Sequence, residues 1–310
     1  MTDAPRDESL GSVLVALAAN LTIAVAKGTA AALTGSPALL AETLHTVADS
    51  GNEVLLYIAI QRSRRPADAS HPFGYGPERY FWALMAAICM FVIGGVVSIW
   101  DGIRSLIHPP ELTAFAAGVT VLLIALVLDG ISRTVASRQL RLQAARRGVS
   151  VRQFVRETPD PTVVTVFFED TLDMLGAVVA LVAIVLHRVT GSSVPDALGS
   201  IVIGGLLCWL AGRLTSRNRQ LLTNQSVPER YVRRLRERLE AEDTIHAVAR
   251  LDAVYLGPAE VFVAADVEMS DGLSGGEVAG VLDRTRADIV REVPAVARIY
   301  ITPVPPSPPA

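Results

Sequence analysis

The sequence predicts an α-helical membrane protein in which six transmembrane helices precede a small cytoplasmic α+β domain. Apolar residues make up 51% of the 310 residues, whereas charged residues make up only 19%. The apolar residues gather in segments close to the ~20 residues that a helix needs to cross a bilayer. After about Val227 these segments give way to short amphipathic patterns, which are typical of a soluble domain.

Six apolar segments within residues 1–222 are long enough to be transmembrane helices. They run over about Leu10–Leu33, Pro37–Gln61, Tyr80–Ile107, Leu112–Val135, Thr162–His187 and Pro195–Leu214. Each contains polar residues, which inside a membrane normally face a neighbouring helix or a water-filled cavity. We therefore expect a six-helix transmembrane domain with a polar interior.

Arginine residues predict the orientation of this domain. They follow the second, fourth and sixth segments and are nearly absent from the alternate connections. They are Arg62, Arg64, Arg65, Arg138, Arg141, Arg146, Arg147, Arg152, Arg156, Arg213, Arg217 and Arg219. Because cytoplasmic loops carry the excess of positive charge, both termini and the arginine-rich loops are expected in the cytoplasm. Orientation and anionic lipid account for this charge, so the expected partner is the bilayer and not a nucleic acid. The alanine- and arginine-rich composition favours a bacterial inner membrane.

A soluble domain is predicted over residues 227–304. Helices are expected over Pro228–Leu239 and Gly276–Val293, and strands over Ala247–Leu256, Glu260–Met269 and Ala297–Val304. The order αββαβ predicts a sheet with its helices on one face. Residues 305–310 are predicted to form a proline-rich tail.

Two pairs of polar residues suggest a metal site inside the membrane. His45 and Asp49 are four residues apart in the second segment, and Glu169 and Asp173 are four apart in the fifth, so each pair shares one helix face. Antiparallel packing of the two helices would set His45 beside Asp173 and Asp49 beside Glu169. Four nitrogen and oxygen ligands suit a tetrahedral divalent transition metal. The alternative is that these carboxyl groups bond one another and serve only packing.

The same groups suggest exchange of metal for protons. Three carboxylates crowded in a low dielectric cannot all stay ionised without a cation. An arriving divalent cation would displace their protons, and its departure would recover them, so metal affinity is linked to pH. No additional proton site is then required.

Further polar residues lie near the predicted ligands. Asp170 follows Glu169 but points about 100° away, so we expect it to contact a neighbouring helix or to support a ligand from behind. Asn52 and Glu53, with Glu42, widen the polar stripe of the second segment. We expect Asn52 and Glu53 to line the ion pathway or to hold the ligands in place.

Two other segments carry polar residues at membrane depth. Asp129 in the fourth segment either lines a cytoplasmic vestibule or pairs with Arg133, four residues on. Asn20 and Lys27 in the first segment are expected to bond neighbouring helices.

The loop between the second and third segments contains a possible second metal site. Asp68 and His71 are suitable ligands, but two residues do not close a site. The alternative is a loop whose Gly74, Gly76 and Pro77 turn the chain back into the membrane.

Together these motifs resemble the cation diffusion facilitator family over nearly the whole chain. The matching pieces are the LxAExxHxxxDxxN run of the second segment, the SHPFGYGxxR loop and the DAxGSxxIG opening of the sixth segment, Asp196 to Gly204. The VRETPDPTVVTVFFEDTLDMLG stretch is most similar to the branch that contains the ninth mammalian zinc transporter.

The resemblance implies a homodimeric exporter that moves Zn²⁺ or a related divalent ion out of the cytosol against protons by alternating access. It implies pairing through the membrane helices and through a C-terminal domain that resembles a metallochaperone. The family's transport-site positions fall on His45, Asp49, Glu169 and Asp173. The metal is then cargo, and no permanently bound cofactor is implied.

Three departures from the family pattern bear on the metal. Most zinc-moving members have histidine where this chain has Glu169, so Mn²⁺, Fe²⁺ or Co²⁺ become plausible cargo beside Zn²⁺. At the loop site Asp68 and His71 match, but the third ligand position holds Tyr75. Only His246 remains of the histidine-rich site of the C-terminal domain.

Two other function classes would use the same four ligands. A membrane-embedded metal-dependent hydrolase would need a further acid–base residue, for which the sequence offers no persuasive candidate, so an enzyme is not expected. A metal sensor would signal through the C-terminal domain without moving the ion. Only an antiporter moves metal in proportion to a proton gradient.

Overall fold

The structure is a computed structural model, and it describes residues 8–146, 148–157, 162–258 and 260–305. The chain divides into two compact units, each described here by itself. The helical unit comprises Met1–Gln61 and Phe81–Arg219, and the C-terminal unit comprises Arg62–Tyr80 and Gln220–Ala310.

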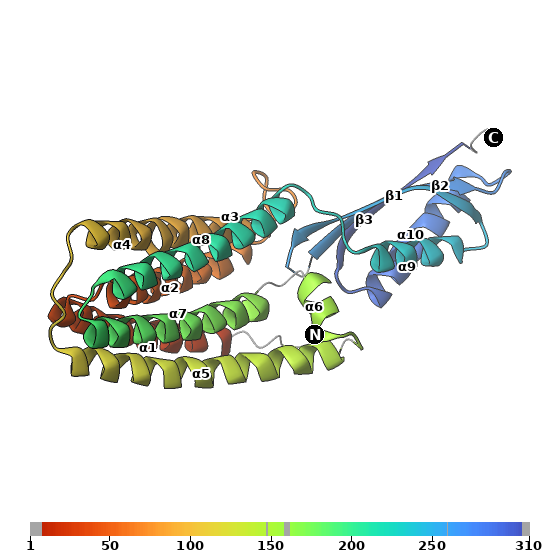
Figure 1. The fold of residues 1–310 in the computed structure, drawn as a ribbon. Helices are drawn as coiled ribbons and strands as arrows, with labels where there is room; N and C mark the ends of the chain where they lie inside the picture. Colours follow the sequence, from red (N-terminus) through yellow and green to blue (C-terminus); the bar gives the residue numbers. More distant parts are fainter. Residues whose placement is uncertain (1–7, 147, 158–161, 259, 306–310) are drawn as a thin grey trace. The chain divides into compact units, whose positions relative to one another are not determined.

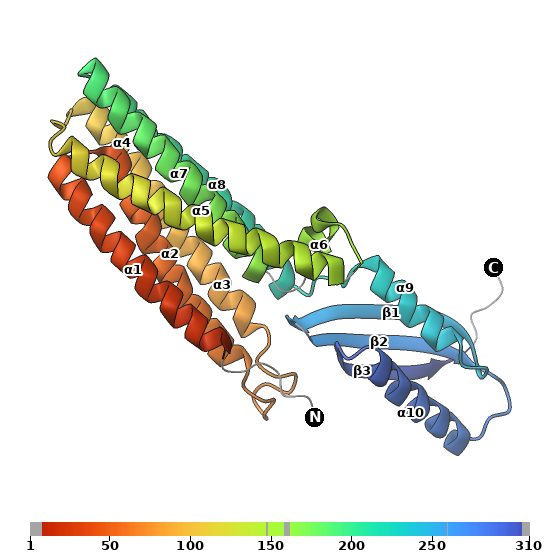
Figure 2. The ribbon, with the colours of Figure 1, turned by 90° about the horizontal axis from the view of Figure 1, so that it is seen from below.

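Long helices running side by side make up the helical unit (Figures 1 and 2). They are α1 (Glu8–Thr34), α2 (Pro37–Ser63), α3 (Glu78–Cys89), α4 (Val97–Ile107), α5 (Phe115–Arg146), α7 (Thr162–Thr190) and α8 (Val194–Leu222), with the short α6 (Val151–Glu157) between α5 and α7. A π-helical segment, Met90–Val96, joins α3 to α4, so that Glu78–Ile107 forms one continuous helix. The structure thus has a long helix at each predicted segment.

Within the described residues, four of these helices are long and apolar enough to cross a membrane. They are Glu78–Ile107, Phe115–Arg146, Phe167–Thr190 and Val194–Leu222. The helix α2 is not among them, because its polar stripe, from Glu42 to Glu53, lowers its hydropathy.

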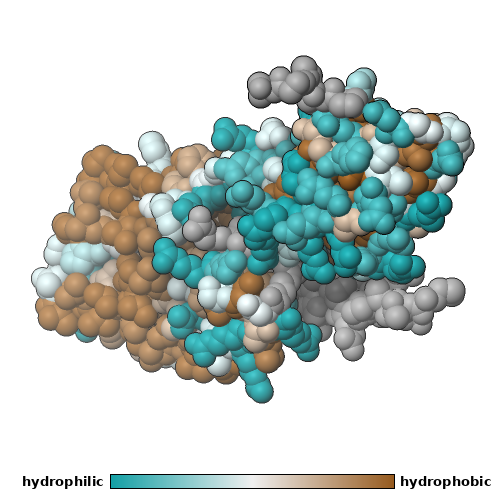
Figure 3. Space-filling model, turned by 90° about the vertical axis from the view of Figure 1, so that its right-hand side faces the viewer, coloured by the Kyte–Doolittle hydropathy of each residue, from teal (hydrophilic) through white to brown (hydrophobic). Residues whose placement is uncertain are grey.

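The helical unit is apolar outside and encloses charged side chains inside. Trp100, Val127 and Val189 are more than half exposed, at 67%, 62% and 77%. Figure 3 shows apolar residues over the visible side of the bundle, in contrast to the mostly hydrophilic C-terminal unit. Lys27 and Glu42, by contrast, are fully buried. This inversion of the pattern found in water-soluble proteins is expected of an integral membrane protein.

The arginine-rich stretch after the fourth segment was predicted as a loop, and this prediction is wrong. The helix α5 continues to Arg146, and α6 follows within the same stretch. No glycine or proline occurs between Ile131 and Arg146, and the abundant alanine, leucine, arginine and glutamine favour helix. Leu140 and Ala144 also pack against Phe154 of α6. Arg147 and the side chain of Arg156 lie outside the described residues, as does most of the predicted proline-rich tail.

Asp196 fastens the N-terminus of α2, the helix that carries His45 and Asp49. Its carboxylate accepts hydrogen bonds from Ser36 Oγ at 2.7 Å and from the backbone N–H of Ala38 at 3.1 Å. The Nδ1 atom of His187, near the end of α7, lies 3.2 Å from its other oxygen. Asp196, in the DAxGS motif, therefore joins the start of α8 to the start of α2 and the end of α7.

The C-terminal unit contains the predicted αββαβ order. Its elements are α9 (Glu229–Glu240), β1 (Ile245–Gly257), β2 (Glu260–Met269), α10 (Gly275–Glu292) and β3 (Val296–Val304). The sheet has the order β1-β2-β3, with β2 antiparallel to β1 and parallel to β3. The crossover that a parallel pair requires is supplied by α10.

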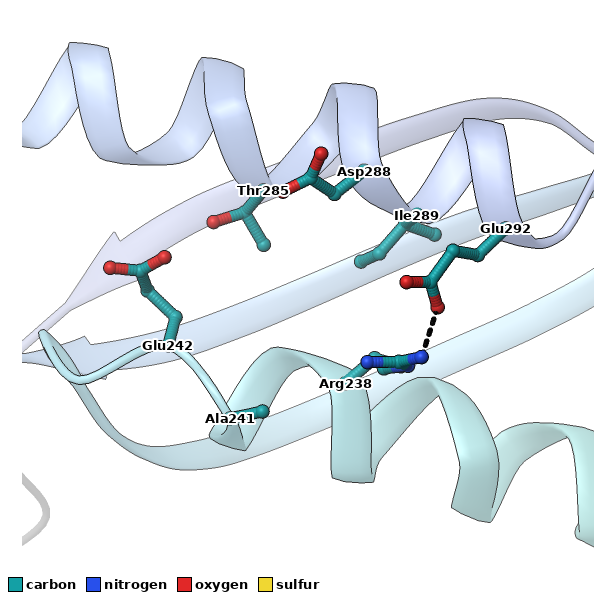
Figure 4. A pocket seen from close by; sticks show the side chains of 7 residues that line it. All are labelled: Arg238, Ala241, Glu242, Thr285, Asp288, Ile289 and Glu292. Carbon is teal, nitrogen blue, oxygen red and sulfur yellow. Dashed lines mark ion pairs between the residues drawn. The ribbon is translucent and has the colours of Figure 1, made fainter.

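Helices α9 and α10 contact each other and pack on β1 and β3 respectively. Alternate residues of β2, including Val263 and Val267, are buried in a core shared with Leu239 of α9 and Ile289 of α10. A shallow pocket of about 160 Å³ lies between the two helices and is crossed by an ion pair of 2.5 Å between Arg238 and Glu292 (Figure 4). The ion pair joins the helices to each other.

The helix α10 begins with a capping box. Ser274 Oγ accepts a hydrogen bond from the backbone N–H of Glu277, and the Glu277 carboxylate accepts one from the backbone N–H of Ser274. The carboxylate also accepts a hydrogen bond from Ser274 Oγ, and the two bonds that it accepts, with the one from the backbone N–H foremost, lower the pKa of Glu277.

The loop Arg62–Tyr80 belongs to the C-terminal unit, although it connects α2 to α3. Phe73 packs edge-on against Phe262 of β2, with 5.7 Å between ring centroids, and the guanidinium of Arg298 lies 5.3 Å above its ring. A Cβ at Gly76 would collide with the carbonyl oxygen of Leu256. The sequence predicted a second metal site or a turn back into the membrane, and the structure also makes the loop part of the C-terminal unit.

Candidate metal site

The polar residues of α2 and α7 form matched rows on facing helices. On α2 the row runs Glu42, His45, Asp49, Asn52, at helical spacings of three or four residues. Asn52 bonds Glu169, and His45 lies against Asp173, so residue numbers rise on one helix as they fall on the other. This is the antiparallel pairing that the sequence predicted.

His45 is at the centre of the site. Its Nε2 atom lies 3.4 Å from Oδ1 of Asp173 and 3.7 Å from Oδ2 of Asp49. The ring is 1% exposed, and among the described residues neither of its nitrogens has a hydrogen-bond partner. One oxygen of Asp49 is also buried without a partner. Buried polar atoms normally find partners, so an imidazole and a carboxylate oxygen left in this state, with the Asp173 carboxylate beside them, fit a site built for a cation.

Glu169 lies at the next position along the row. Its Oε1 atom accepts a hydrogen bond of 2.7 Å from Asn52 Nδ2. In the predicted quartet, Asp49 and Asp173 therefore lie around the imidazole nitrogen of His45, and the fourth residue, Glu169, is held by an amide. The sequence predicts that Asp49 lies beside Glu169. In the structure, Asn52 is the residue of α2 that donates a hydrogen bond to Glu169.

Glu42 is a site residue that the sequence placed only in the polar stripe. One ligand atom each of Glu42, His45 and Asp173 lie within 4.8 Å of one another. Its spacing from His45, three residues on one helix face, is the signal that identifies it. The structure thus adds a fourth carboxylate to the three of the predicted quartet, on the other side of His45 from Asn52.

The first helix supplies a cation to this carboxylate. Lys27 Nζ lies 2.9 Å from Glu42 Oε1 and 2.9 Å from Thr46 Oγ1. Further along α1, Asn20 Nδ2 donates to Glu53 Oε1 at 3.0 Å. The prediction that Lys27 and Asn20 bond a neighbouring helix is confirmed.

Asp170 and Asp129 connect the site to α5. Asp170 Oδ2 accepts a hydrogen bond of 2.9 Å from Ser132, so it contacts a neighbouring helix as expected. The proposed pair between Asp129 and Arg133 is wrong: Arg133 Nε donates to Thr171 at 3.1 Å, and one oxygen of Asp129 is buried without a partner among the described residues. Lining of a cytoplasmic vestibule by Asp129 stays a prediction.

In the loop, Asp68 has the contacts of a turn residue. Its carboxylate accepts hydrogen bonds from Ser70 Oγ and the Ser70 and His71 backbone N–H groups, at 2.7 to 2.9 Å, and from Tyr75 OH at 2.8 Å. These bonds, with those from Ser70 foremost, lower the pKa of Asp68 well below its usual range. The ring of His71 stacks on Tyr75, with 4.0 Å between centroids. The structure therefore gives Asp68 and His71 a role in the turn, and metal binding there stays a prediction.

The cation efflux transmembrane domain family matches residues 13–223. The human protein named proton-coupled zinc antiporter SLC30A9, mitochondrial, is 31% identical over 256 residues, which are 83% of this chain and 45% of that protein.

Two further relatives come from a plant and a bacterium. Metal tolerance protein C4 of Arabidopsis thaliana is 31% identical over 240 residues, 76% of this chain and 51% of that protein. The cation-efflux pump FieF of Klebsiella pneumoniae is 26% identical over 264 residues, 84% of this chain and 81% of that protein. The chain spans about half the length of the human and plant relatives.

Proposed function

This chain belongs to the cation efflux family of membrane transporters, and we propose that it exports divalent transition-metal ions from the cytosol in exchange for protons. The observation that carries the proposal is the convergence of Asp49 and Asp173 on the buried Nε2 atom of His45. We propose Zn²⁺ as first cargo and Mn²⁺, Fe²⁺ or Co²⁺ as alternatives. The human and bacterial relatives are named as a zinc antiporter and a cation-efflux pump, and these names support the proposed function.

The proposed membrane arrangement has six spans. They are α1, α2, the continuous helix Glu78–Ile107, α5, α7 and α8, with both termini in the cytoplasm of a bacterial inner membrane. The positive-inside rule supports this orientation, because arginines cluster at the ends of α2, α5 and α8. In this orientation α2 runs from the outer face at Pro37 toward the cytoplasm at Ser63. Two copies would pair through the C-terminal unit and the membrane helices.

The proposed exchange uses the ligands themselves. Each carboxylate or imidazole nitrogen that binds metal must first lose its proton, so metal and protons compete for the same lone pairs. Asp49 and Asp173 each lie within 4 Å of His45 Nε2, so we assign the exchanged protons to the cluster and not to one residue. An outward-facing site at lower pH would then release metal and take up protons.

Glu169 bears on the choice of metal. A carboxylate in place of an imidazole makes the set of donors harder and more anionic, which favours Mn²⁺ or Fe²⁺ relative to Zn²⁺. In the structure the carboxylate is held by Asn52, which leaves its second oxygen for the metal. The proposed transport site is therefore His45, Asp49, Glu169 and Asp173, with Glu42 adjoining it.

Uptake into proteoliposomes tests the proposal. Wild type and Asp49→Ala are compared for uptake of Zn²⁺, Mn²⁺, Fe²⁺ and Co²⁺ with and without an imposed pH gradient. We expect uptake that follows the gradient in the wild type and its loss in Asp49→Ala. A wild type that binds metal but moves none would favour the sensor instead. Normal transport by Asp49→Ala would show that the site is elsewhere.

A further inference from the structure

The buried ion pair between Lys27 and Glu42 has no part in the exchange described so far. Lys27 is 1% exposed and Glu42 is 0% exposed. The ammonium makes two bonds of 2.9 Å, one to Glu42 Oε1 and one to Thr46 Oγ1. It is thus a fixed positive charge inside the bundle, and it has two acceptors on α2.

The second oxygen of Glu42 lies against α7, at Gly176. Among the described residues Oε2 is buried and has no hydrogen-bond partner. A Cβ at Gly176 of α7 would collide with it, so the carboxylate occupies the space that this glycine leaves. With ligand atoms of His45 and Asp173 within 4.8 Å, Glu42 lies between the ammonium and the candidate site.

Position along α2 places Glu42 on the outer side of this site. Glu42 precedes His45 by three residues, which is about 4.5 Å of helix rise. In the proposed orientation α2 enters from the outer face, so an ion leaving the site outward would meet Glu42 after His45.

We propose that Glu42 is an exit ligand and that Lys27 is a tethered cation that competes with the departing metal for it. This inference rests on the proposed function. When the metal reaches Glu42, the ammonium keeps Thr46 as its acceptor. When Lys27 re-forms its bond to Glu42, the metal loses a ligand and is repelled by a like charge, which promotes its release. Lys27 stays protonated throughout, so this step moves no proton.

A purely structural pair would have different consequences. It would hold α1 against α2, and its loss would lower stability without changing how folded protein binds metal. A competing cation instead weakens metal binding in order to speed release. Its removal is therefore expected to tighten binding and slow turnover, a combination that a structural pair does not produce.

The first test compares Lys27→Met, Lys27→Arg and the double variant Lys27→Met/Glu42→Gln, all as full-length protein. Calorimetry measures equilibrium affinity for Zn²⁺ and Mn²⁺, and proteoliposome uptake gives KM and Vmax. For Lys27→Met we expect binding tighter by more than about tenfold, because a like charge beside the metal is gone. We also expect a fall of similar size in Vmax. Lys27→Arg should remain near wild type, and the double variant should lose the added affinity.

A second variant covers the case in which Lys27→Met does not fold. Thr46→Val removes the other acceptor of the ammonium and keeps the side-chain volume. We expect a lower Vmax in the folded variant, because Glu42 is then the acceptor that remains for the ammonium. Thr43→Val is the matched control, because the Thr43 hydroxyl bonds only the Leu39 carbonyl of its own helix among the described contacts.

The outcomes separate this inference from the proposed function. Wild-type vesicles that move no metal would overturn the proposed function, and this inference with it. Wild-type transport together with unchanged affinity and Vmax in folded Lys27→Met or Thr46→Val would overturn only the role of Lys27.

Discussion

Asn52 Nδ2 donates a hydrogen bond of 2.7 Å to Glu169 Oε1, and this bond fixes the carboxylate on which the metal preference depends. A ligand held by a neighbouring amide has fewer rotamers to lose when the metal binds. Groups that orient a ligand from behind typically contribute about 10- to 100-fold to metal affinity. Two predictions about this pair can therefore be separated.

Replacement of Asn52 by leucine should weaken metal binding by about 10-fold or more, because Glu169 loses its donor. Calorimetry on purified protein measures this change. Gln61→Leu is the control, since Gln61 lies on the same helix but bonds only Tyr57 among the described contacts. Equal losses in both variants would mean that the polar stripe matters only for folding.

Replacement of Glu169 by histidine should shift preference toward Zn²⁺ over Mn²⁺, because imidazole is a softer ligand than carboxylate. The ratio of Zn²⁺ to Mn²⁺ uptake in proteoliposomes measures this preference. An unchanged ratio would show that Glu169 does not coordinate the metal.

Metal binding should release protons, because metal and protons compete for the same atoms. This competition determines how metal affinity changes with pH. The affinity for metal should fall as the pH falls, because protons then compete with the metal for the carboxylates and His45. Titration with Zn²⁺ in buffers of different ionisation enthalpy counts the protons released. Asp173→Asn should lower both this count and the affinity. Asp252→Asn, which alters an exposed strand residue paired with Arg250, should change neither.

Gly176→Ala should impair transport, although alanine normally stabilises a helix by about 0.5–1 kcal/mol relative to glycine. The new methyl group would collide with Glu42 Oε2, whereas at Gly212 of α8 the same change meets open space. We therefore expect Gly176→Ala to lose most uptake and Gly212→Ala to retain it, at similar expression. If both behave as wild type, Glu42 does not need its present position.

The order of helices and strands could be predicted from the sequence, because hydropathy and periodicity identify each helix or strand from its own residues. The pairing of His45 with Asp173 was also predictable, since equal spacings on antiparallel helices bring such residues to one depth. The extension of α5 to Arg146 was not, because a polar helix and a loop have similar hydropathy.

The ion pair of Lys27 with Glu42 depends on the rotation of α1 about its axis, which a single sequence does not determine. The hydrogen bond between Asn52 and Glu169 depends on side-chain rotamers at one level of the row. Sequence spacing predicts which faces meet, and only the packed structure shows which atoms bond.

The stability of α10 should decrease at acid pH, because the capping contribution of Glu277 is then lost. Its pKa is lowered in the folded state, so its capping contribution is present above its ordinary pKa and is lost as the pH falls through the lowered value. Hydrogen exchange of α10, corrected for intrinsic rates, should show less protection at acid pH in the wild type than near neutrality. Glu277→Gln should reduce this difference, whereas Glu237→Gln on the exposed face of α9 should not. Ser274→Ala should cost about 1 kcal/mol near neutral pH.

The loop Arg62–Tyr80 should leave the C-terminal unit when Gly76 becomes alanine. The new Cβ would collide with the Leu256 carbonyl, a backbone atom that cannot rotate away, and such overpacking costs about 1–3 kcal/mol. Hydrogen exchange and proteolysis should both increase across this loop. Ala67→Val, at an exposed position of the same loop, should leave both unchanged.

The same variant tests whether the soluble unit influences transport. The loop directly follows α2, which carries His45 and Asp49, so release of the loop frees the C-terminal end of that helix. We expect Gly76→Ala to lower Vmax more than it changes metal affinity, because the ligands lie well inside α2. Increased exchange with an unchanged Vmax would show that the attachment of this loop stabilises the C-terminal unit alone.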